Sequence, residues 1–303
     1  MITPITRRTF LRTSAATIAG VSIVDSFTSP LWAEPLVTYP GIQLYTVDKE
    51  LKADVEGTLK TIQSIGYKEV EGAGFAGLSP KEFRAALDGV GLKCSSTHFF
   101  NFGEGDPSAI FDQANTLGVK YVVSSFIGRF GHNKTGGEAG PDEYKVMAEY
   151  FNELGASAKK AGLQLAYHNH NSEFTDLGQG RVGYDIFVDA TDSGLVKLEL
   201  DCGWMVAAGH NPVDYFRRYP NRYRMVHIKD FVNTAKPSMS LERSLVPQGT
   251  VLGTGYIKYK PILVAAKVAG VEHFFIEQEP PFIGTTAIEA ATKDYQYLAS
   301  MSK

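Results

Sequence analysis

Polar side chains that could do chemistry follow several short apolar runs of the sequence. Residues 196–201 end on Asp201, residues 225–228 contain His227, and residues 274–277 end on Glu277. If these side chains meet, their carboxylates repel one another and take up protons unless a cation lies between them. We therefore expect the three residues to bind one divalent ion. Mostly oxygen ligands with one imidazole favour Mn²⁺, with Mg²⁺, Co²⁺ or Zn²⁺ as alternatives, over a structural zinc site of cysteines.

Other apolar runs also end on polar residues. A lone polar residue after a strand is more typical of a loop or a helix cap than of a ligand, so no single one of them indicates a site. Four residues at or near such ends are expected to contact a substrate: Glu71, His98, Trp204 and Lys229. A buried aromatic residue such as Trp204 is more often plain packing than a sugar-stacking residue. Pairing with the adjacent Asp230 is the more common role for Lys229.

Stretches with helical periodicity separate the apolar runs. Residues 54–65 repeat apolar side chains every three to four positions, and residues 80–87 and 141–158 do so after a proline. Glycines at positions 66, 118 and 162 close three helices before a strand. Alternating strands and helices indicate parallel βαβ units, and eight of them match a closed barrel. The fold prediction is an α/β protein with a (β/α)8 TIM barrel.

An open, doubly wound sheet is the alternative architecture. It would usually carry a glycine-rich phosphate loop after its first strand, and residues 42–48 contain no such loop. In a closed barrel the carboxyl ends of all strands meet at one face, which is where active sites are built. We therefore expect the polar strand ends to form one ring, with residues 128–140 and 231–255 as loops over it.

The first 33 residues differ in character from the rest. Residues 6–12, TRRTFLR, precede a weakly apolar stretch and a small residue, Ala33, where a peptidase could cut. They resemble a twin-arginine export signal, and an amphipathic N-terminal helix is the alternative. The resemblance implies export of a folded protein to the periplasm or the extracellular space, with any metal acquired before translocation. Residues 34–303 are then one mature TIM-barrel domain.

Composition limits the classes of partner. The formal net charge is -3, which does not favour nucleic acid or an anionic membrane. No later segment reaches about 18 consecutive apolar residues, so no membrane span is expected in the mature form. A small sugar is the expected partner. The sequence leaves undecided whether the protein forms a homo-oligomer. Cys94 and Cys202 lie in apolar runs and are expected to be buried free thiols rather than a disulfide.

Four motifs in order resemble the xylose isomerase-like TIM-barrel superfamily, and within it the exported proteins labelled sugar phosphate isomerase/epimerase. They are YHNHNSEF at 167–174, LDCGW at 200–204 with AGHNP at 208–212, VHIKD at 226–230, and FIEQE at 275–279. The resemblance covers the chain from about residue 40 to its end. It implies a metal held by Glu, Asp, His and Glu of strands five to eight, of which the last three match Asp201, His227 and Glu277.

The fourth ligand is open, because His168 stands where many members have the strand-five glutamate. Either His168 takes the ligand position or Glu173 supplies the missing carboxylate. Glu173 is preferred, since it keeps the net charge at the ion closer to zero. His168 and His170 are then free for proton transfer, for which an imidazole near neutrality is suited.

The expected reaction begins with removal of a proton next to the carbonyl of a sugar, through an enediolate stabilised by the ion. Returning the proton gives a metal-dependent sugar isomerase or epimerase, the first prediction. A β leaving group turns the same intermediate into the substrate of a dehydratase or lyase acting on a 3-keto sugar or 3-keto-glycoside. A non-catalytic sugar-binding protein is a further alternative. The superfamily also contains endonucleases for abasic DNA, which the negative charge disfavours.

Overall fold

The computed structural model describes residues 36–100, 102, 106–125, 139–232, 236–240, 242 and 245–301. The expected export signal, residues 1–33, lies outside these ranges, as does most of the expected loop at 128–140. Within the described ranges, no helix combines the length and the apolar character needed to cross a membrane.

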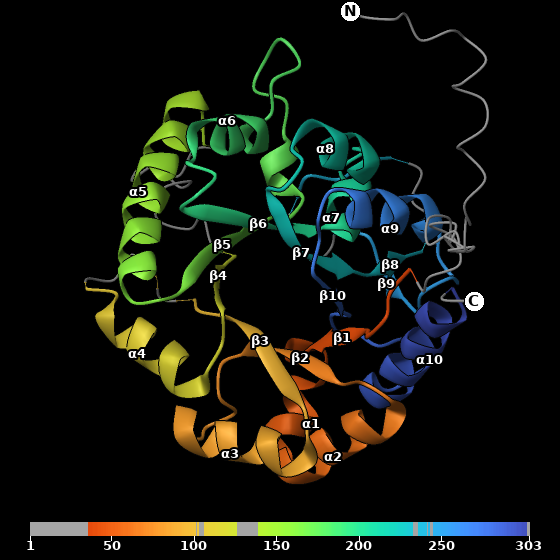
Figure 1. Ribbon diagram of the computed structural model, residues 1–303. Coiled ribbons are helices and arrows are strands. Elements are labelled where there is room, and N and C mark those ends of the chain that lie inside the picture. The colour runs from red at the N-terminus through yellow and green to blue at the C-terminus, as the bar shows by residue number, and fades with distance from the viewer. Residues whose placement is uncertain are drawn as a thin grey trace, which may run out of the picture. The chain divides into compact units, whose positions relative to one another are not determined.

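Eight parallel strands close into a barrel, which confirms the predicted fold (Figure 1). Their order around the ring is β1-β10-β7-β6-β5-β4-β3-β2. Consecutive strands are neighbours because each crossover helix returns the chain to the next position. The strands are β1 (Gly41–Gln43), β2 (Glu69–Ala73), β3 (Lys93–His98), β4 (Tyr121–Ser124), β5 (Gln164–His168), β6 (Val196–Asp201), β7 (Tyr223–Ile228) and β10 (His273–Ile276).

Helices surround the strands, and those expected at 54–65, 80–87 and 141–158 are present as α2, α3 and α5. Gly66, Gly118 and Gly162 have positive φ at the turns that lead into strands, a conformation that only glycine adopts without strain. The helices are α1 (Asp48–Ala53), α2 (Val55–Ile65), α3 (Pro80–Val90), α4 (Ser108–Leu117), α5 (Pro141–Lys160), α6 (Gly183–Ala190), α7 (Cys202–Ala207), α8 (Pro212–Arg218), α9 (Tyr259–Val268) and α10 (Ala287–Ser300), with short 3₁₀ turns η1 (Leu44–Val47) and η2 (Ser172–Phe174).

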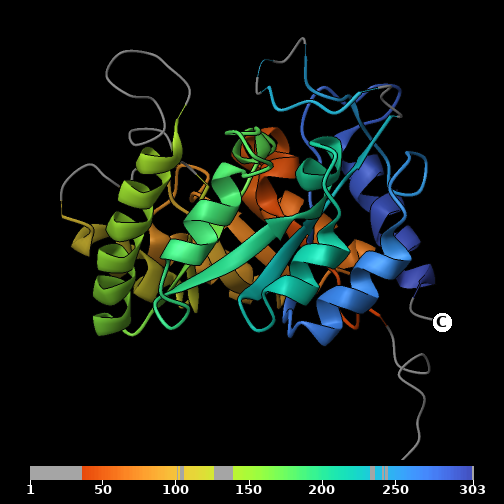
Figure 2. The same ribbon diagram turned by 90° about the horizontal axis from the view of Figure 1, so that it is seen from above.

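A small antiparallel pair, β8 (Asp230–Phe231) and β9 (Gly249–Thr250), follows β7. In Figure 2 the cyan and light-blue segment after β7 rises above one end of the barrel. The sequence expectation that residues 231–255 lie over the mouth agrees with this arrangement.

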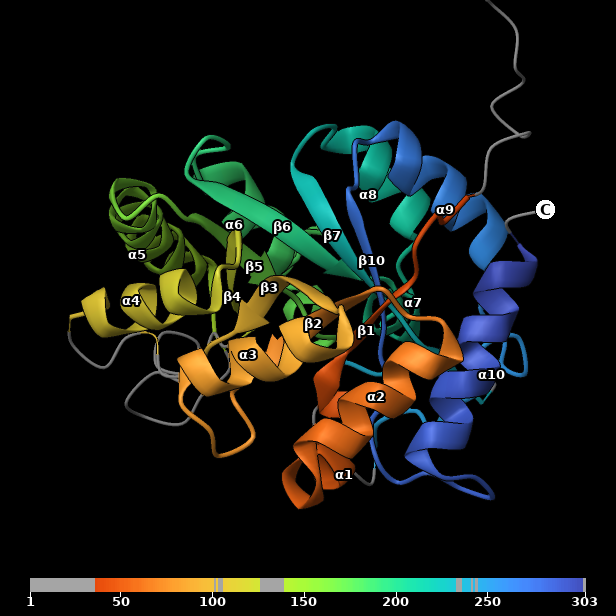
Figure 3. The ribbon, with the colours of Figure 1, turned by 60° about the horizontal axis from the view of Figure 1, so that its bottom comes forward.

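The first and last elements close the ring. Strand β1 pairs with both β2 and β10, and α10 lies beside α2 (Figure 3). The buried Tyr67 hydroxyl donates to the carbonyl of Ala291 at 2.8 Å, and its ring meets that of Tyr295 edge-on at 5.0 Å. The C-terminal helix is thereby fixed to the chain segment that leads into β2.

Inside the barrel, side chains change from apolar to polar along the strands. A small apolar cluster fills one layer, and it consists of Tyr121, Val123, Ala166, Met225 and Phe275. Toward the carboxyl ends, the inward positions are polar: His168 follows Ala166 by two residues, and His227 follows Met225 by two. Because side chains alternate across a strand, each such pair faces the same interior. Cys94 is half-buried and Cys202 buried, and both are free thiols.

Candidate metal centre and substrate pocket

Strand register brings the predicted residues of β5, β6 and β7 side by side. His168 is the partner of Glu199, and Asp201 is the partner of His227. Glu199 and Asp201 are two residues apart on β6, so both carboxylates face the barrel interior. All four side chains are buried. The barrel therefore presents two layers of ionisable groups, one at the mouth and one beneath it.

Three predicted metal ligands and a lysine converge in the mouth layer. His227 Nδ1 lies 3.0 Å from Glu277 Oε2. Lys229 Nζ lies 2.9 Å from Asp201 Oδ2 and 2.6 Å from Glu277 Oε2. Burial opposes ionisation of Glu277, but Lys229 and His227 hold the pKa of that carboxyl well below its usual range. Glu277 is thus ionised, as a ligand carboxylate must be.

Asp201 has two roles, one for each oxygen. Its Oδ1 accepts a hydrogen bond from the Trp204 amide at 2.8 Å and caps α7. The sequence analysis gave Asp201 only as a metal ligand and did not foresee this cap. Its Oδ2 forms an ion pair with Lys229 Nζ at 2.9 Å and accepts no further hydrogen bond from residues in the described ranges. That oxygen faces His168 Nε2 at 3.8 Å and His227 Nδ1 at 4.0 Å.

Beneath the mouth lies a second layer, which holds Glu199, a residue that the sequence interpretation missed. Glu199 Oε2 lies 2.9 Å from His168 Nδ1 and 2.9 Å from His98 Nε2. Its Oε1 is buried and has no hydrogen-bond partner among the residues that the structure describes. The strand periodicity could have found it, because a glutamate two positions before Asp201 must share the inward face.

Glu71 occupies the same lower layer on the opposite side. Its Oε2 lies 2.5 Å from His227 Nε2 and accepts a hydrogen bond from Gln43 Nε2 at 2.9 Å, while Oε1 accepts one from the Ser96 hydroxyl at 2.6 Å. His98 Nε2 lies 3.2 Å from the same Oε2. Neither Glu71 nor His98 lines the mouth pocket. They contact His227 and Glu199 below the mouth, and their expected contact with substrate stays a prediction.

These carboxylates orient the two imidazoles toward the mouth. Glu199 faces Nδ1 of His168 and leaves Nε2 toward Asp201, whereas Glu71 faces Nε2 of His227 and leaves Nδ1 toward Glu277. Burial lowers the pKa of His168 well below its usual value, so this ring is neutral. Burial also opposes the charge on His227, but Glu199, Glu277 and Glu71 raise its pKa well above the usual value.

Glu173 does not join the cluster. The structure shows its carboxylate held within its own turn: Oε1 accepts hydrogen bonds from the Tyr167 hydroxyl at 2.7 Å and the His170 amide at 3.0 Å. Its Oε2 accepts one from the Ser172 hydroxyl at 2.7 Å. Of the two alternatives for the fourth ligand, the geometry brings His168 and not Glu173 to Asp201.

The buried His, Glu and Asp cluster suits a divalent metal. Two ligands of one ion, with bonds of about 2.0–2.2 Å, are separated by at most about 4.4 Å. The separations of 3.8 and 4.0 Å from Asp201 Oδ2 to His168 Nε2 and His227 Nδ1 lie within this limit. Asp201 Oδ2 keeps a lone pair besides the one that faces Lys229 Nζ. Two groups of residues therefore have ligand atoms close enough for one ion: Asp201, His227 and Glu277 at the mouth, and His98, His168, Glu199 and His227 beneath it. His168 also lies within this limit of Asp201.

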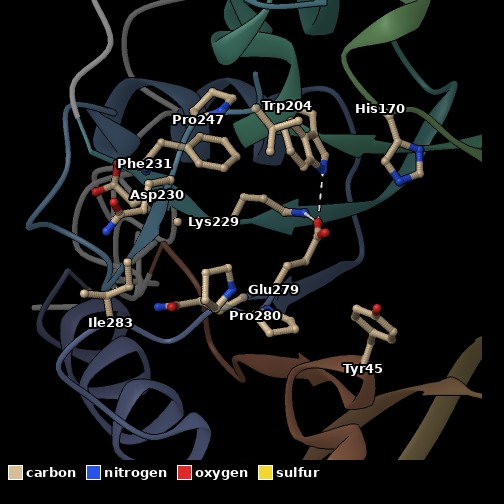
Figure 4. Close-up of a pocket in the computed structure, with 15 residues that line it drawn as sticks. Tyr45, His170, Trp204, Lys229, Asp230, Phe231, Pro247, Glu279, Pro280 and Ile283 are labelled. Atoms are coloured by element: carbon tan, nitrogen blue, oxygen red, sulfur yellow. Dashed lines mark hydrogen bonds and ion pairs between the residues drawn. The ribbon is translucent and has the colours of Figure 1, made fainter. Parts of the chain in front are cut away.

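A pocket of about 420 Å³ opens above this layer. Figure 4 shows Lys229 extending between Trp204 and Glu279, with His170 and Tyr45 across the opening. Glu279 Oε1 accepts hydrogen bonds from Lys229 Nζ at 2.7 Å and from Trp204 Nε1 at 3.2 Å. Glu279 is a second residue that the sequence interpretation missed. Trp204, Lys229 and His170, which it did single out, all line the pocket.

Lys229 does not pair with Asp230, contrary to the role considered more common. Asp230 instead accepts hydrogen bonds from loop amides, including those of Gly253 and Gly255 at 3.0 Å each. Lys229 passes over Gly203, where a Cβ atom would collide with the lysine side chain. The glycine of the LDCGW motif therefore makes room for the lysine that reaches the carboxylates.

Comparisons with known proteins agree with this arrangement. Inosose dehydratases of Clostridium perfringens (strain ATCC 13124) and Lacticaseibacillus casei are 29% and 28% identical, covering 62% and 77% of this chain and 67% and 85% of the relatives. A solved sugar phosphate isomerase/epimerase from Parabacteroides distasonis ATCC 8503 superposes with a TM-score of 0.70 at 25% identity, covering 92% of this chain and 99% of that one. The family model described as xylose isomerase-like TIM barrel matches residues 59–299, and this chain belongs to that family.

Proposed function

We propose that this protein is a metal-dependent enzyme that removes the proton next to the carbonyl of a keto-sugar or keto-cyclitol and then expels a β substituent, as a dehydratase or lyase. The observation that carries the choice of elimination is the position of Glu173. With Glu173 held in its own turn and His168 at the fourth position, the site lacks the paired carboxylates that a symmetrical epimerase uses on the two faces of its substrate. The inosose dehydratase relatives support the same choice.

The ligand set proposed for the ion consists of His168, Asp201, His227 and Glu277. A divalent ion held there would polarise the substrate carbonyl and lower the pKa of the neighbouring C–H bond. Two imidazoles and two carboxylates suit Mn²⁺, Co²⁺ or Zn²⁺ better than Mg²⁺. We keep Mn²⁺ as the first candidate.

The pocket residues carry the proton transfers. His170 lines the pocket next to Trp204, with ring centroids 6.3 Å apart, and takes the proton from the carbon. The C–O bond to the β substituent then breaks, and the Lys229 ammonium donates a proton to the departing oxygen. Glu279 accepts hydrogen bonds from both Lys229 and Trp204, which fixes the lysine against the pocket wall. The indole face is available to stack on the sugar ring.

Substrate turnover in D₂O tests this proposal. Metal-loaded protein is incubated with a panel of keto-sugars, keto-glycosides and keto-cyclitols, and both deuterium incorporation at the α-carbon and loss of the β substituent are followed. His170→Asn should lower kcat by about 10²–10⁴-fold while metal content stays unchanged. His210→Asn is the matched control, because His210 packs against Phe174 and Tyr215 and does not line the pocket. An equal loss in both variants, or no exchange with any substrate, would contradict the proposal.

Isomerisation is the second candidate, because the Parabacteroides distasonis structure carries that function in its name and covers nearly the whole fold. The same experiment distinguishes the two reactions. An isomerase yields a product with the composition of the substrate, heavier only by the deuterium at the adjacent carbon. A dehydratase yields a product that has lost water.

A further inference from the structure

A buried carboxylate lies directly behind the imidazole proposed as the fourth ligand. His168 Nδ1 lies 2.9 Å from Glu199 Oε2, and both side chains are buried. We propose that Glu199 is the positioning residue of His168: it fixes the ring with Nε2 toward the ion and places a carboxylate behind a ligand that carries none. This inference rests on the metal-dependent function proposed above.

The position of Glu199 is fixed from both sides. His98 Nε2 lies 2.9 Å from the same Oε2 that faces His168, so the carboxylate is held between two imidazoles of different strands. The His98 and His168 rings meet edge-on at 5.1 Å. A neutral imidazole donates from one nitrogen and binds a metal through the other, so a carboxylate at Nδ1 dictates that Nε2 is the free donor atom. That nitrogen is the one nearest Asp201 Oδ2, at 3.8 Å.

A parallel arrangement supports this reading of the geometry. The other imidazole of the ligand set, His227, has Glu71 at its Nε2 and presents Nδ1 to Glu277. Glu71 comes from β2 and Glu199 from β6, so two independent strands place a fully buried carboxylate behind an imidazole. Burying a carboxylate is costly unless it is paired, and each of these is paired with a ring whose other nitrogen points to the mouth.

The first test measures metal affinity in Glu199→Gln, which keeps the shape and removes the charge. Its Kd for Mn²⁺, Co²⁺ and Zn²⁺, measured by competition with a chelating dye, should rise by about 10–100-fold relative to wild type. Glu173→Gln is the matched control: it removes a carboxylate of similar burial, 2% against 0% exposed, that does not reach the ligand layer. Its metal Kd should not change. Circular dichroism and thermal unfolding of the ion-free proteins check that both variants fold.

The second test moves the charge instead of removing it. Combining Glu199→Gln with His168→Glu returns a carboxylate to the ligand position and removes the one behind it, and metal affinity should recover to within a few-fold of wild type. His168→Glu alone leaves two carboxylates in contact and should bind the ion less tightly than the double variant. The absorption bands of bound Co²⁺ should shift in the double variant, because an oxygen replaces a nitrogen ligand.

The outcomes separate this inference from the proposed function. Unchanged affinity in Glu199→Gln, an equal loss in Glu173→Gln, or no recovery in the double variant overturns the positioning role while leaving metal-dependent catalysis intact. A wild-type protein that binds none of the three ions overturns both. Weakened binding in Glu199→Gln, with recovery on relocation of the charge, supports the inference.

Discussion

The lysine at the mouth already supplies a cation to the carboxylates that are proposed to hold the metal. Lys229 is 3% exposed, and its ammonium pairs with Asp201, Glu277 and Glu279 at 2.6–2.9 Å. Burial opposes the charge on Lys229, but these carboxylates raise its pKa well above the usual value. Replacing Lys229 by methionine keeps most of the side-chain volume and removes the charge. The stability lost in Lys229→Met should differ between ion-free and ion-bound protein.

The size of this difference follows from the number of carboxylates involved. Breaking a buried ion pair by removing one partner costs about 3–5 kcal/mol, because the remaining charge is left uncompensated. A divalent ion at the site would compensate two of the three carboxylates, Asp201 and Glu277, but not Glu279. We therefore expect metal to recover about 2 kcal/mol of the stability lost in Lys229→Met. By linkage, the variant should bind the ion about 30-fold more tightly than wild type.

Chemical unfolding in the presence of chelator, and then in saturating Mn²⁺, measures the free energy of unfolding without and with metal. A dye competition measures the metal Kd independently. Lys120→Met is the control, because Lys120 is a surface lysine whose ammonium pairs with Glu272 at 3.0 Å and with none of the proposed ligands. The small loss of stability in Lys120→Met should be the same with and without metal. If the penalty in Lys229→Met is unchanged by metal, or if its Kd rises, the reasoning that lysine and ion share the same carboxylates is refuted.

Three further predictions concern other parts of the chain. Burial raises the pKa of the Asp294 carboxyl to about 7, against about 4 in the unfolded chain, so its contribution to stability is complete below about pH 4 and is lost as the pH rises through 7. Asp294→Asn should flatten the urea stability profile over this window, and an unaltered pH slope would contradict the assignment. Tyr67→Phe should cost about 1–2 kcal/mol in urea unfolding, because the Ala291 carbonyl loses a buried donor; a change below about 0.5 kcal/mol would show that water replaces it. We also propose export through the twin-arginine route, so changing Arg7 and Arg8 to lysine should leave precursor in the cytoplasm, and normal export of that variant would exclude this route.

Much of the fold was predictable because its signals are local. Apolar runs, helical periodicity and glycines that close helices are properties of short segments, and they indicated the barrel and the helices correctly. The meeting of Asp201, His227 and Glu277 also followed, since each lies at the carboxyl end of a barrel strand. Such convergence depends on topology alone.

The residues that were missed show what local signals leave out. Glu199 was overlooked because the run LELD was read as an apolar strand with one terminal carboxylate, although strand alternation places both acidic residues on one face. Alternation also argues against the Lys229–Asp230 pair, since successive side chains of an extended segment point to opposite sides. The inward position of Glu199 and the separation of Lys229 from Asp230 could both have been predicted from the sequence.

The position of the Glu173 carboxylate could not have been predicted from the sequence. Its carboxylate is satisfied by a tyrosine hydroxyl from the preceding strand and by a hydroxyl and an amide of its own turn. Whether a glutamate folds toward a metal or toward nearby donors depends on distances of a few ångströms that only the folded turn defines. Glu279 is similar, because its hydrogen bonds to Lys229 and Trp204 join the segments after β10 and β7 to helix α7.

The pairing of β1 with β10 has a consequence for when the protein can become active during its synthesis. The ring stays open until the ribosome has released β10, and Glu277 follows that strand directly. A nascent chain thus carries Asp201 and His227 well before their acidic counterpart exists. Insertion of an ion at the proposed site would then follow translation, and a protein exported in the folded state would take whichever ion the compartment of its synthesis supplies.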